Sequence, residues 1–175
     1  MRLTAFEAVA RALADAGVRY LVAGGVAVNA HGYARFTADL DLVIALDPAN
    51  VGAAFTALAS IGYRPNVPVT AQSFSDAEQR RRWMAEKGMQ VLNFYSETHR
   101  ATSVDVFVYE PFDFAQEFDT APRGDLLPGL TVRYVSVPTL IAMKQAAGRP
   151  RDLDDIQHLR LILEQGRPDQ GSGHE

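Results

Sequence analysis

Cysteine is absent from the 175 residues, which excludes disulfides, thiolate metal sites and a cysteine nucleophile. Long hydrophobic runs are also missing: no segment approaches the roughly 20 apolar residues that a membrane-spanning helix needs. No unbroken apolar stretch follows Met1, so the pattern of a signal peptide is not present. We therefore expect a cytoplasmic protein with no membrane association.

The sequence has little excess charge of either sign. It contains 17 basic and 21 acidic residues, a net charge of −4. Proteins that coat nucleic acid non-specifically need a basic surface, so this class is excluded, although a local basic patch is not. The fractions of hydrophobic (47%) and charged (22%) residues are ordinary for a globular chain. We predict one domain over residues 1–165 and a disordered tail over 166–175, where apolar residues are nearly absent.

Hydrophobic periodicity and glycine or proline breaks predict alternating helices and short strands. The predicted helices are 4–16, 26–31, 48–60 (with Asp47 as N-cap), 76–87, 136–147 and 152–165, and the predicted strands are 20–23, 39–46, 89–95, 103–109 and 130–135. Residues 63–75 are expected to form a loop or edge strand, and 110–128 to be irregular or partly helical. This order predicts an α+β or α/β domain with one mixed sheet and a C-terminal pair of helices.

Asp39 and Asp41 are the first candidates for chemistry. They are two residues apart in a predicted strand, so their side chains point to the same face, while Leu40 and Leu42 point to the other. Two adjacent carboxylates repel each other unless a cation lies between them or one is protonated. Oxygen ligands of this kind suit Mg²⁺. The alternative is an exposed strand with two solvated aspartates, although aspartate is disfavoured in strands.

Gly24-Gly25 and Asp105 extend this candidate site. The glycine pair ends a buried strand and opens a helix, where backbone N–H groups can approach a phosphate; the alternative is a plain tight turn. Asp105 lies between Val104 and Val106 in a predicted internal strand. If that strand neighbours 39–46, the third carboxylate can bind a second metal or accept a proton. The alternative is an edge-strand aspartate facing water.

The order of these features resembles the polymerase-β-type nucleotidyltransferase superfamily. Its signature is a Gly-Gly or Gly-Ser turn, a short helix and then Asp-x-Asp on a strand, which residues 20–46 match. Arg35-Phe36-Thr37, an Arg-x-Thr before the aspartates, most resembles the AbiEii-type abortive-infection nucleotidyltransferases. A helical Lys144 followed by Arg-Asp-x-x-Asp at 151–155 resembles the same family.

This resemblance implies a nucleotidyltransferase fold and a role for each matched residue. The implied metal ligands for Mg²⁺ or Mn²⁺ are Asp39, Asp41 and Asp105, which with Lys144 also form the catalytic set. The implied nucleotide-binding residues are Gly24, Gly25, Arg35, Thr37, Lys144 and Asp152, with Lys144 on the triphosphate and Asp152 orienting it or the metal. Gly25 replaces the serine that is usual in the superfamily; small-molecule resistance members also have Gly-Gly.

Three further groups of residues are ambiguous. His31 follows a short helix and is either its C-terminal cap or catalytic. The run from Arg80 to Trp83 is either a contact for RNA or nucleotide, or the solvated face of a polar helix, which we favour. Arg149 and Arg151 either bind phosphate or pair with Asp154 and Asp155.

Three functions are consistent with these residues. The first is metal-dependent transfer of a nucleoside monophosphate, from a triphosphate such as ATP, to a hydroxyl of tRNA or protein. The toxin–antitoxin branch of the resemblance implies a cognate partner encoded nearby. The second is transfer to an antibiotic, although the chain lacks the long C-terminal helical domain common in such enzymes. The third is a binding or antitoxin-like module with little catalysis, suggested by the short chain and its acidic charge.

Overall fold

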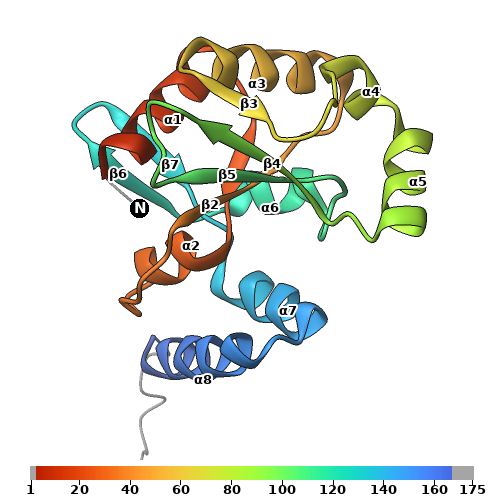
Figure 1. The fold of residues 1–175 in the computed structure, drawn as a ribbon. Coiled ribbons are helices and arrows are strands. Elements are labelled where there is room, and N and C mark those ends of the chain that lie inside the picture. The colour runs from red at the N-terminus through yellow and green to blue at the C-terminus, as the bar shows by residue number, and fades with distance from the viewer. Residues whose placement is uncertain (1–2, 167–175) are drawn as a thin grey trace, which may run out of the picture.

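A mixed five-stranded sheet lies at the centre of the computed structural model, which describes residues 3–166 (Figure 1). The strand order is β1-β2-β5-β4-β3. β2 and β5 are parallel, and the other neighbouring pairs are antiparallel. The strands are β1 Tyr20–Val22, β2 Asp39–Ile44, β3 Tyr63–Pro65, β4 Val91–Ser96 and β5 Ser103–Phe107.

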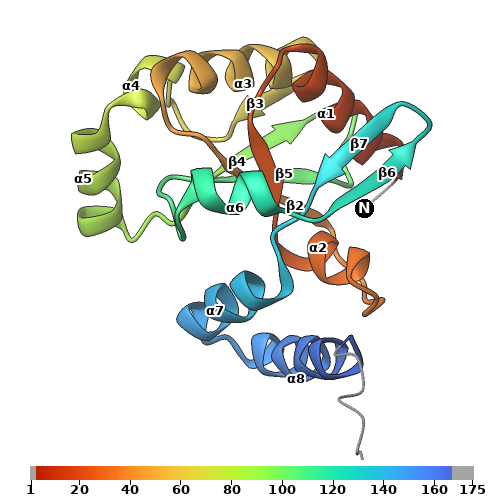
Figure 2. The same ribbon diagram turned by 180° about the vertical axis from the view of Figure 1, so that it is seen from behind.

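Helices cover both faces of this sheet (Figure 2). On one face, α1 and α3 pack their apolar side chains against buried residues such as Leu40 and Leu42 of β2. On the other face a second apolar cluster joins α2, α6, α7 and α8 to Leu21 and Val43 of the sheet. The helices are α1 Leu3–Asp15, α2 Gly24–Ala30, α3 Pro48–Ser60, α4 Ala71–Ser75, α5 Ala77–Lys87, α6 Phe114–Thr120, α7 Val137–Ala147 and α8 Pro150–Gln165. The predicted α+β architecture with a C-terminal helical pair is confirmed.

A hairpin beside the sheet corrects one prediction. β6 (Arg123–Leu127) pairs with β7 (Leu130–Arg133), and Val135 N–H donates to Val22 O of β1 at 2.9 Å. Residues 110–128 were expected to be irregular or partly helical; this is right for α6 but wrong for β6. Glycine and aspartate lower the strand propensity of 123–127, and pairing with β7 outweighs it.

The starts of α3 and α4 follow capping residues in the sequence. The edge strand expected within 63–75 is β3, but the same range also holds the short helix α4, whose Thr70 cap accepts from Ser73 N–H at 3.1 Å. Asp47 caps α3, as predicted, by accepting from Asn50 N–H at 3.0 Å. The predicted tail lies outside the described residues apart from Gly166. Over 3–166, no helix combines the length and apolarity needed to cross a bilayer.

Candidate functional site

The three candidate aspartates lie on neighbouring strands. Asp39 and Asp41 are on β2, and Asp105 on β5 is the direct parallel partner of Asp41. The alternating residues Leu40 and Val104 are fully buried on the opposite face. Because β5 lies between β2 and β4, the alternative of an edge-strand Asp105 is wrong. The sheet thus places all three carboxylates on one face.

The carboxylates of Asp39 and Asp105 each accept a hydrogen bond from a residue on a neighbouring strand. The exposed Asp39 accepts from Ser103 Oγ at 2.7 Å, and Asp105 accepts from Asn93 Nδ2 at 2.7 Å. In this arrangement, no three Asp, Glu or His side chains within 3–166 are placed to hold a metal ion together. The donor atoms are nevertheless the carboxylate oxygens that Mg²⁺ prefers. Metal binding by these aspartates therefore stays a prediction.

Burial and mutual repulsion act on the central carboxylates. Burial, followed by the charges of Asp105 and Asp39, raises the pKa of Asp41 to about 6, against the smaller opposing effect of Arg149 and Lys144. Burial also raises the pKa of Asp105, although its hydrogen bond from Asn93 opposes this. A divalent cation would relieve this concentration of negative charge. The electrostatics therefore fit the donor chemistry of a metal site.

The glycine pair packs directly against site residues. Gly24 has φ 59°, and a β-carbon there would lie 2.0 Å from Asp41 Oδ2. At Gly25, a β-carbon would lie 2.8 Å from Thr37 Oγ1 and 3.0 Å from an Arg35 Nη atom. A plain tight turn does not explain these close approaches. The side chains of Thr37 and Arg35 fill the space where a serine side chain at position 25 would begin.

Lys144 reaches the site from α7. The start of this helix is fixed by Glu117 of α6, which accepts from Ser136 N–H at 2.7 Å. Lys144 is 6% exposed, and its Nζ lies 2.6 Å from Asp155 Oδ2 and 3.5 Å from Asp152 Oδ1. The structure therefore places Lys144 against Asp152, one of the predicted nucleotide-binding residues, and against Asp155.

Asp152 and Arg149 form a second ion pair at the start of α8. Asp152 Oδ2 accepts from both the backbone N–H and the Nε of Arg149, each at 3.0 Å. Burial raises the pKa of Asp152, but these bonds and the charges of Arg149 and Lys144 outweigh it and lower the pKa overall. For Arg149 the sequence left open either phosphate binding or pairing with Asp154 and Asp155; in the structure its ion pair is with Asp152. Asp152 thus orients Arg149 and Lys144 at once.

Asp155, the last residue of the Arg-Asp-x-x-Asp pattern, has a role at the site that the sequence did not predict. It is 1% exposed and contacts both Arg35 and Lys144. The sequence held one signal for it: residues three apart in a helix share a face, so Asp155 follows Asp152 on the inner side of α8. Its partner Arg35 comes from the loop between α2 and β2, which no helical pattern predicts.

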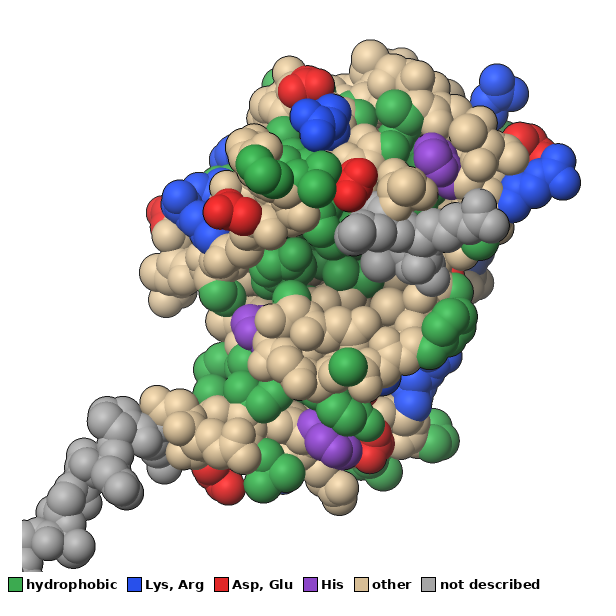
Figure 3. Space-filling view, turned by 90° about the vertical axis from the view of Figure 1, so that its left-hand side faces the viewer, with side chains coloured by type: hydrophobic (Ala, Val, Ile, Leu, Met, Phe, Trp, Pro, Cys, Tyr) green, Lys and Arg blue, Asp and Glu red, His purple; other side chains and the backbone are tan. Residues whose placement is uncertain are grey.

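His31 and the run from Arg80 to Trp83 make contacts that support the fold or face solvent. His31 follows α2, and its Nε2 lies 2.8 Å from Val135 O, which favours a structural role. Arg81 and Arg82 are exposed and lie near Glu78 and Glu86, as expected for a solvated helix face. Within the same run, Arg80 and Trp83 are buried, and Arg80 donates to Phe74 O at 2.6 Å. Basic and acidic side chains are scattered over the side of the molecule in Figure 3.

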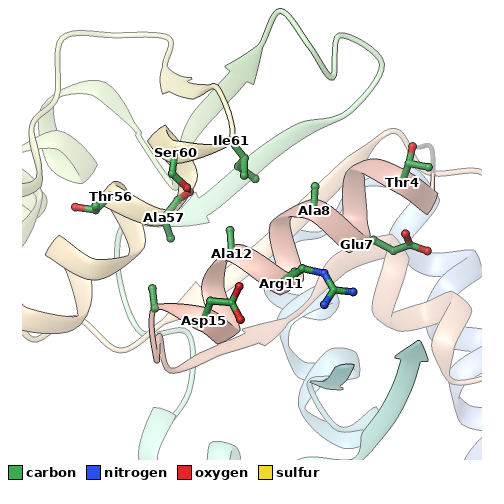
Figure 4. Close-up of a pocket in the computed structure, with 11 residues that line it drawn as sticks. Thr4, Glu7, Ala8, Arg11, Ala12, Asp15, Thr56, Ala57, Ser60 and Ile61 are labelled. Carbon is green, nitrogen blue, oxygen red and sulfur yellow. The ribbon is translucent and has the colours of Figure 1, made fainter. Parts of the chain in front are cut away.

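An open groove of about 690 Å³ lies between α1 and α3. Figure 4 shows the residues that line it. It is lined by small residues, including Ala8, Ala12 and Ala57, with Arg11 and Asp15 at its border. These helices cover the sheet face that carries Leu40. Since the carboxylates point to the opposite face, this groove is not part of the candidate site.

The raised pKa of Asp41 predicts that the Asp41→Asn variant is more stable than the wild type without metal. The pKa in the folded chain exceeds the ordinary value of 3.8, so the charged carboxylate costs the fold stability above about pH 6. We expect a gain of roughly 1 to 3 kcal/mol at pH 7.5 that disappears below about pH 4. Urea unfolding in a chelator measures this. Asp39→Asn, at an exposed position on the same strand, should change stability far less; equal effects would contradict the prediction.

Comparison with known proteins agrees with this geometry. The family model described as "Nucleotidyl transferase AbiEii toxin, Type IV TA system" matches residues 8–165. No curated protein matches the chain. The fold is similar to a crystal structure of ANT(2'')-Ia in complex with adenylyl-2''-tobramycin (TM-score 0.58, 14% identity, covering 92% of this chain and 88% of that one). It is also similar to a solution structure of the antibiotic-resistance factor ANT(2'')-Ia (TM-score 0.57, 16% identity, covering 93% of this chain and 83% of that one). The chain therefore belongs to the AbiEii nucleotidyltransferase family and is a transferase with the nucleotidyltransferase fold.

Proposed function

We propose that this nucleotidyltransferase uses Mg²⁺ or Mn²⁺ to move a nucleoside monophosphate from a triphosphate to a hydroxyl group of RNA or protein. The observation that carries this proposal is the placement of Asp41 opposite Asp105 on parallel strands, with Gly24 against Asp41 and the cationic side chain of Arg35 beside Gly25. Carboxylates that bind metal beside cations that bind phosphate are the two elements that phosphoryl transfer requires.

The residues of the cluster divide between metal and nucleotide. Asp39 and Asp41 are proposed to hold the metal, which when bound neutralises charge on the phosphoryl oxygens. Asp105 completes this set. The phosphates are proposed to lie against the turn at Gly24 and Gly25. Their contacts would come from the hydroxyl of Thr37 and the charges of Arg35 and Lys144, and Asp152 would orient Lys144.

The proposed reaction is an in-line displacement. The acceptor oxygen forms a bond to the α-phosphorus, the bond from that phosphorus to the pyrophosphate oxygen breaks, and pyrophosphate leaves. The Asp105 carboxylate, opposite Asp41 on the neighbouring strand, is the group proposed to accept the proton of the acceptor hydroxyl. The side chains mainly position the reactants and stabilise charge.

The openness of the site favours a large acceptor. Asp39 is exposed, and Phe36, in the adjoining loop, is 83% exposed. An exposed aromatic ring at such a position can stack on an unpaired base of RNA. We therefore rank tRNA or another macromolecule above a small antibiotic of the kind in the ANT(2'')-Ia complex. In the type IV toxin–antitoxin setting that the family description names, a cognate partner encoded nearby and a cytoplasmic location follow as further proposals.

Transfer from each α-labelled nucleoside triphosphate, with Mg²⁺, tests the acceptor. The candidate acceptors are total tRNA, cell-extract protein and tobramycin, supplied separately. We expect label in tRNA or protein, and none without the divalent ion. Label in tobramycin alone would contradict the macromolecular acceptor but leave the transferase assignment intact.

A further inference from the structure

Asp155 joins two cations that come from different parts of the chain. Arg35 Nε lies 2.8 Å from its Oδ1, and Arg35 Nη2 donates to its Oδ2 at 2.9 Å. Lys144 Nζ donates to the same Oδ2 at 2.6 Å. The Asp155 side chain is 1% exposed, against 18% for Arg35 and 7% for Lys144. One buried carboxylate therefore holds a loop residue and a residue of α7 through its own position on α8.

Arg35 lies beside the glycine turn of the candidate nucleotide site, and Lys144 shares the carboxylate of Asp155 with it. The Arg35 guanidinium packs over the α-carbon of Gly25, close enough that a β-carbon there would lie 3.0 Å away. Lys144 lies beside Arg35, because both donate to Oδ2 of Asp155. The backbone of the loop is fixed as well, because Asn29 donates to Arg35 O and accepts from Arg35 N–H, each at 2.9 Å. Asp155 thus sets the spacing of two positive charges beside the glycine turn.

Lys144 is buried and Arg35 is half-buried, and two like charges in such surroundings need a counter-charge to stay side by side. Asp152 also contacts Lys144, but only at 3.5 Å, and it is engaged by Arg149 at 3.0 Å. Without Asp155, Arg35 and Lys144 would repel each other, and two long side chains would regain their rotamer freedom. A phosphate would then have to order them at the moment of binding, which weakens affinity.

We propose that Asp155 is a positioning residue that holds Arg35 and Lys144 as a preorganised pair of cations for the triphosphate. This proposal rests on the proposed function, in which those two residues bind phosphate. It predicts an effect that grows with the number of phosphates on the ligand. A residue that only stabilised the fold would not produce this dependence.

The test is calorimetric binding of ATP, GTP, CTP and UTP, and of the matching monophosphates, with Mg²⁺. For Asp155→Asn we expect triphosphate affinity to fall by about 10- to 100-fold, the range seen when residues supporting a site are removed. Monophosphate affinity should change by less than about threefold, since fewer phosphate oxygens contact the pair. Unchanged or tighter triphosphate binding would overturn the proposal, because Asp155 would then be neutral or a competitor.

Asp154→Asn is the matched control. Asp154 is the adjacent residue on α8, exposed, and accepts from Tyr33 OH at 2.6 Å without contacting either cation. The Asp154→Asn variant should bind triphosphates with the affinity of the wild type. If Asp155→Asn does not fold, Asp155→Glu replaces it, because this variant keeps the charge but displaces the carboxylate. We expect its affinity for triphosphates to fall several-fold while its affinity for monophosphates is unchanged. A triphosphate affinity equal to that of the wild type would overturn the proposal.

Lys144→Gln separates the two proposals. If it binds triphosphate like the wild type, the proposed function fails at this residue. If Lys144→Gln weakens triphosphate binding and Asp155→Asn does not, only the proposed positioning role of Asp155 fails. In the Lys144→Gln background, Asp155→Asn should add less than it does alone, because one of the two cations that Asp155 holds is already absent. Full additivity of the two effects would contradict that coupling.

Discussion

Replacing Asp39 and Asp41 together by asparagine should reduce nucleotide transfer by at least about 1,000-fold, a loss comparable to removing a principal charge-stabilising group from an active site. The substitution removes the two carboxylates proposed to hold the metal, while Leu40 and its neighbours on the buried face are unchanged. The protein should stay folded, because Asp39 is exposed and Asp41 is destabilising when charged. Pyrophosphate release in the presence of tRNA and each triphosphate measures the effect.

Asp125→Asn is the control for that experiment. Asp125 is an exposed carboxylate on β6 that accepts from Thr131 Oγ1 at 2.8 Å, and it lies in the hairpin rather than in the main sheet. Its loss should leave pyrophosphate release within about twofold of the wild type, as for most surface substitutions. Release that persists in the double variant would show that the two strand aspartates are not the catalytic ligands.

Gly24→Ala should damage both the fold and the site. The backbone there has φ 59°, which costs a residue with a β-carbon about 1 to 2 kcal/mol. The same β-carbon would lie 2.0 Å from Asp41 Oδ2, so either α2 or the carboxylate must move, at a further cost of about 1 to 3 kcal/mol. We expect a loss of about 2 to 5 kcal/mol in the free energy of unfolding. Transfer should fall by about 100-fold, as when a reacting group is displaced by an ångström.

Gly17→Ala isolates the backbone part of that effect. Gly17 has nearly the same conformation, φ 65°, but a β-carbon there would meet nothing within 4 Å. It should lose only about 1 to 2 kcal/mol and keep full transfer activity. Urea unfolding and the transfer assay, applied to both variants, separate strain from the contact with Asp41. Equal losses in the two variants would mean that the contact has no consequence.

The polar pattern of the strands was enough to predict where the carboxylates lie. Alternation placed Asp39 and Asp41 on one face, and the apolar neighbours of Asp105 placed it in an internal strand, which the pairing of β2 with β5 confirms. The resemblance to a family supplied the link to Lys144, more than 100 residues away in the chain. Both signals are short patterns of residues that can be recognised along the sequence without knowing how distant segments pack.

Contacts between side chains from distant elements were not predictable in this way. Nothing local shows that Arg35 meets Asp155 across 120 residues, or that Asp39 turns toward Ser103 and Asp105 toward Asn93. The strand β6 was missed for a related reason, since its residues favour a strand only when β7 is paired with them. Tertiary contacts decide these features, and a single sequence carries no record of them.

The central claim is that these aspartates and cations form one metal-dependent nucleotide site. Calorimetric titration of each nucleoside triphosphate into the wild type and into the Asp39→Asn, Asp41→Asn double variant, with Mg²⁺ and with chelator, tests it most directly. We predict binding of at least one triphosphate that requires Mg²⁺ and is lost in the double variant. Absence of binding by the folded wild type, or binding that is equal with and without the ion and the two carboxylates, would contradict the claim.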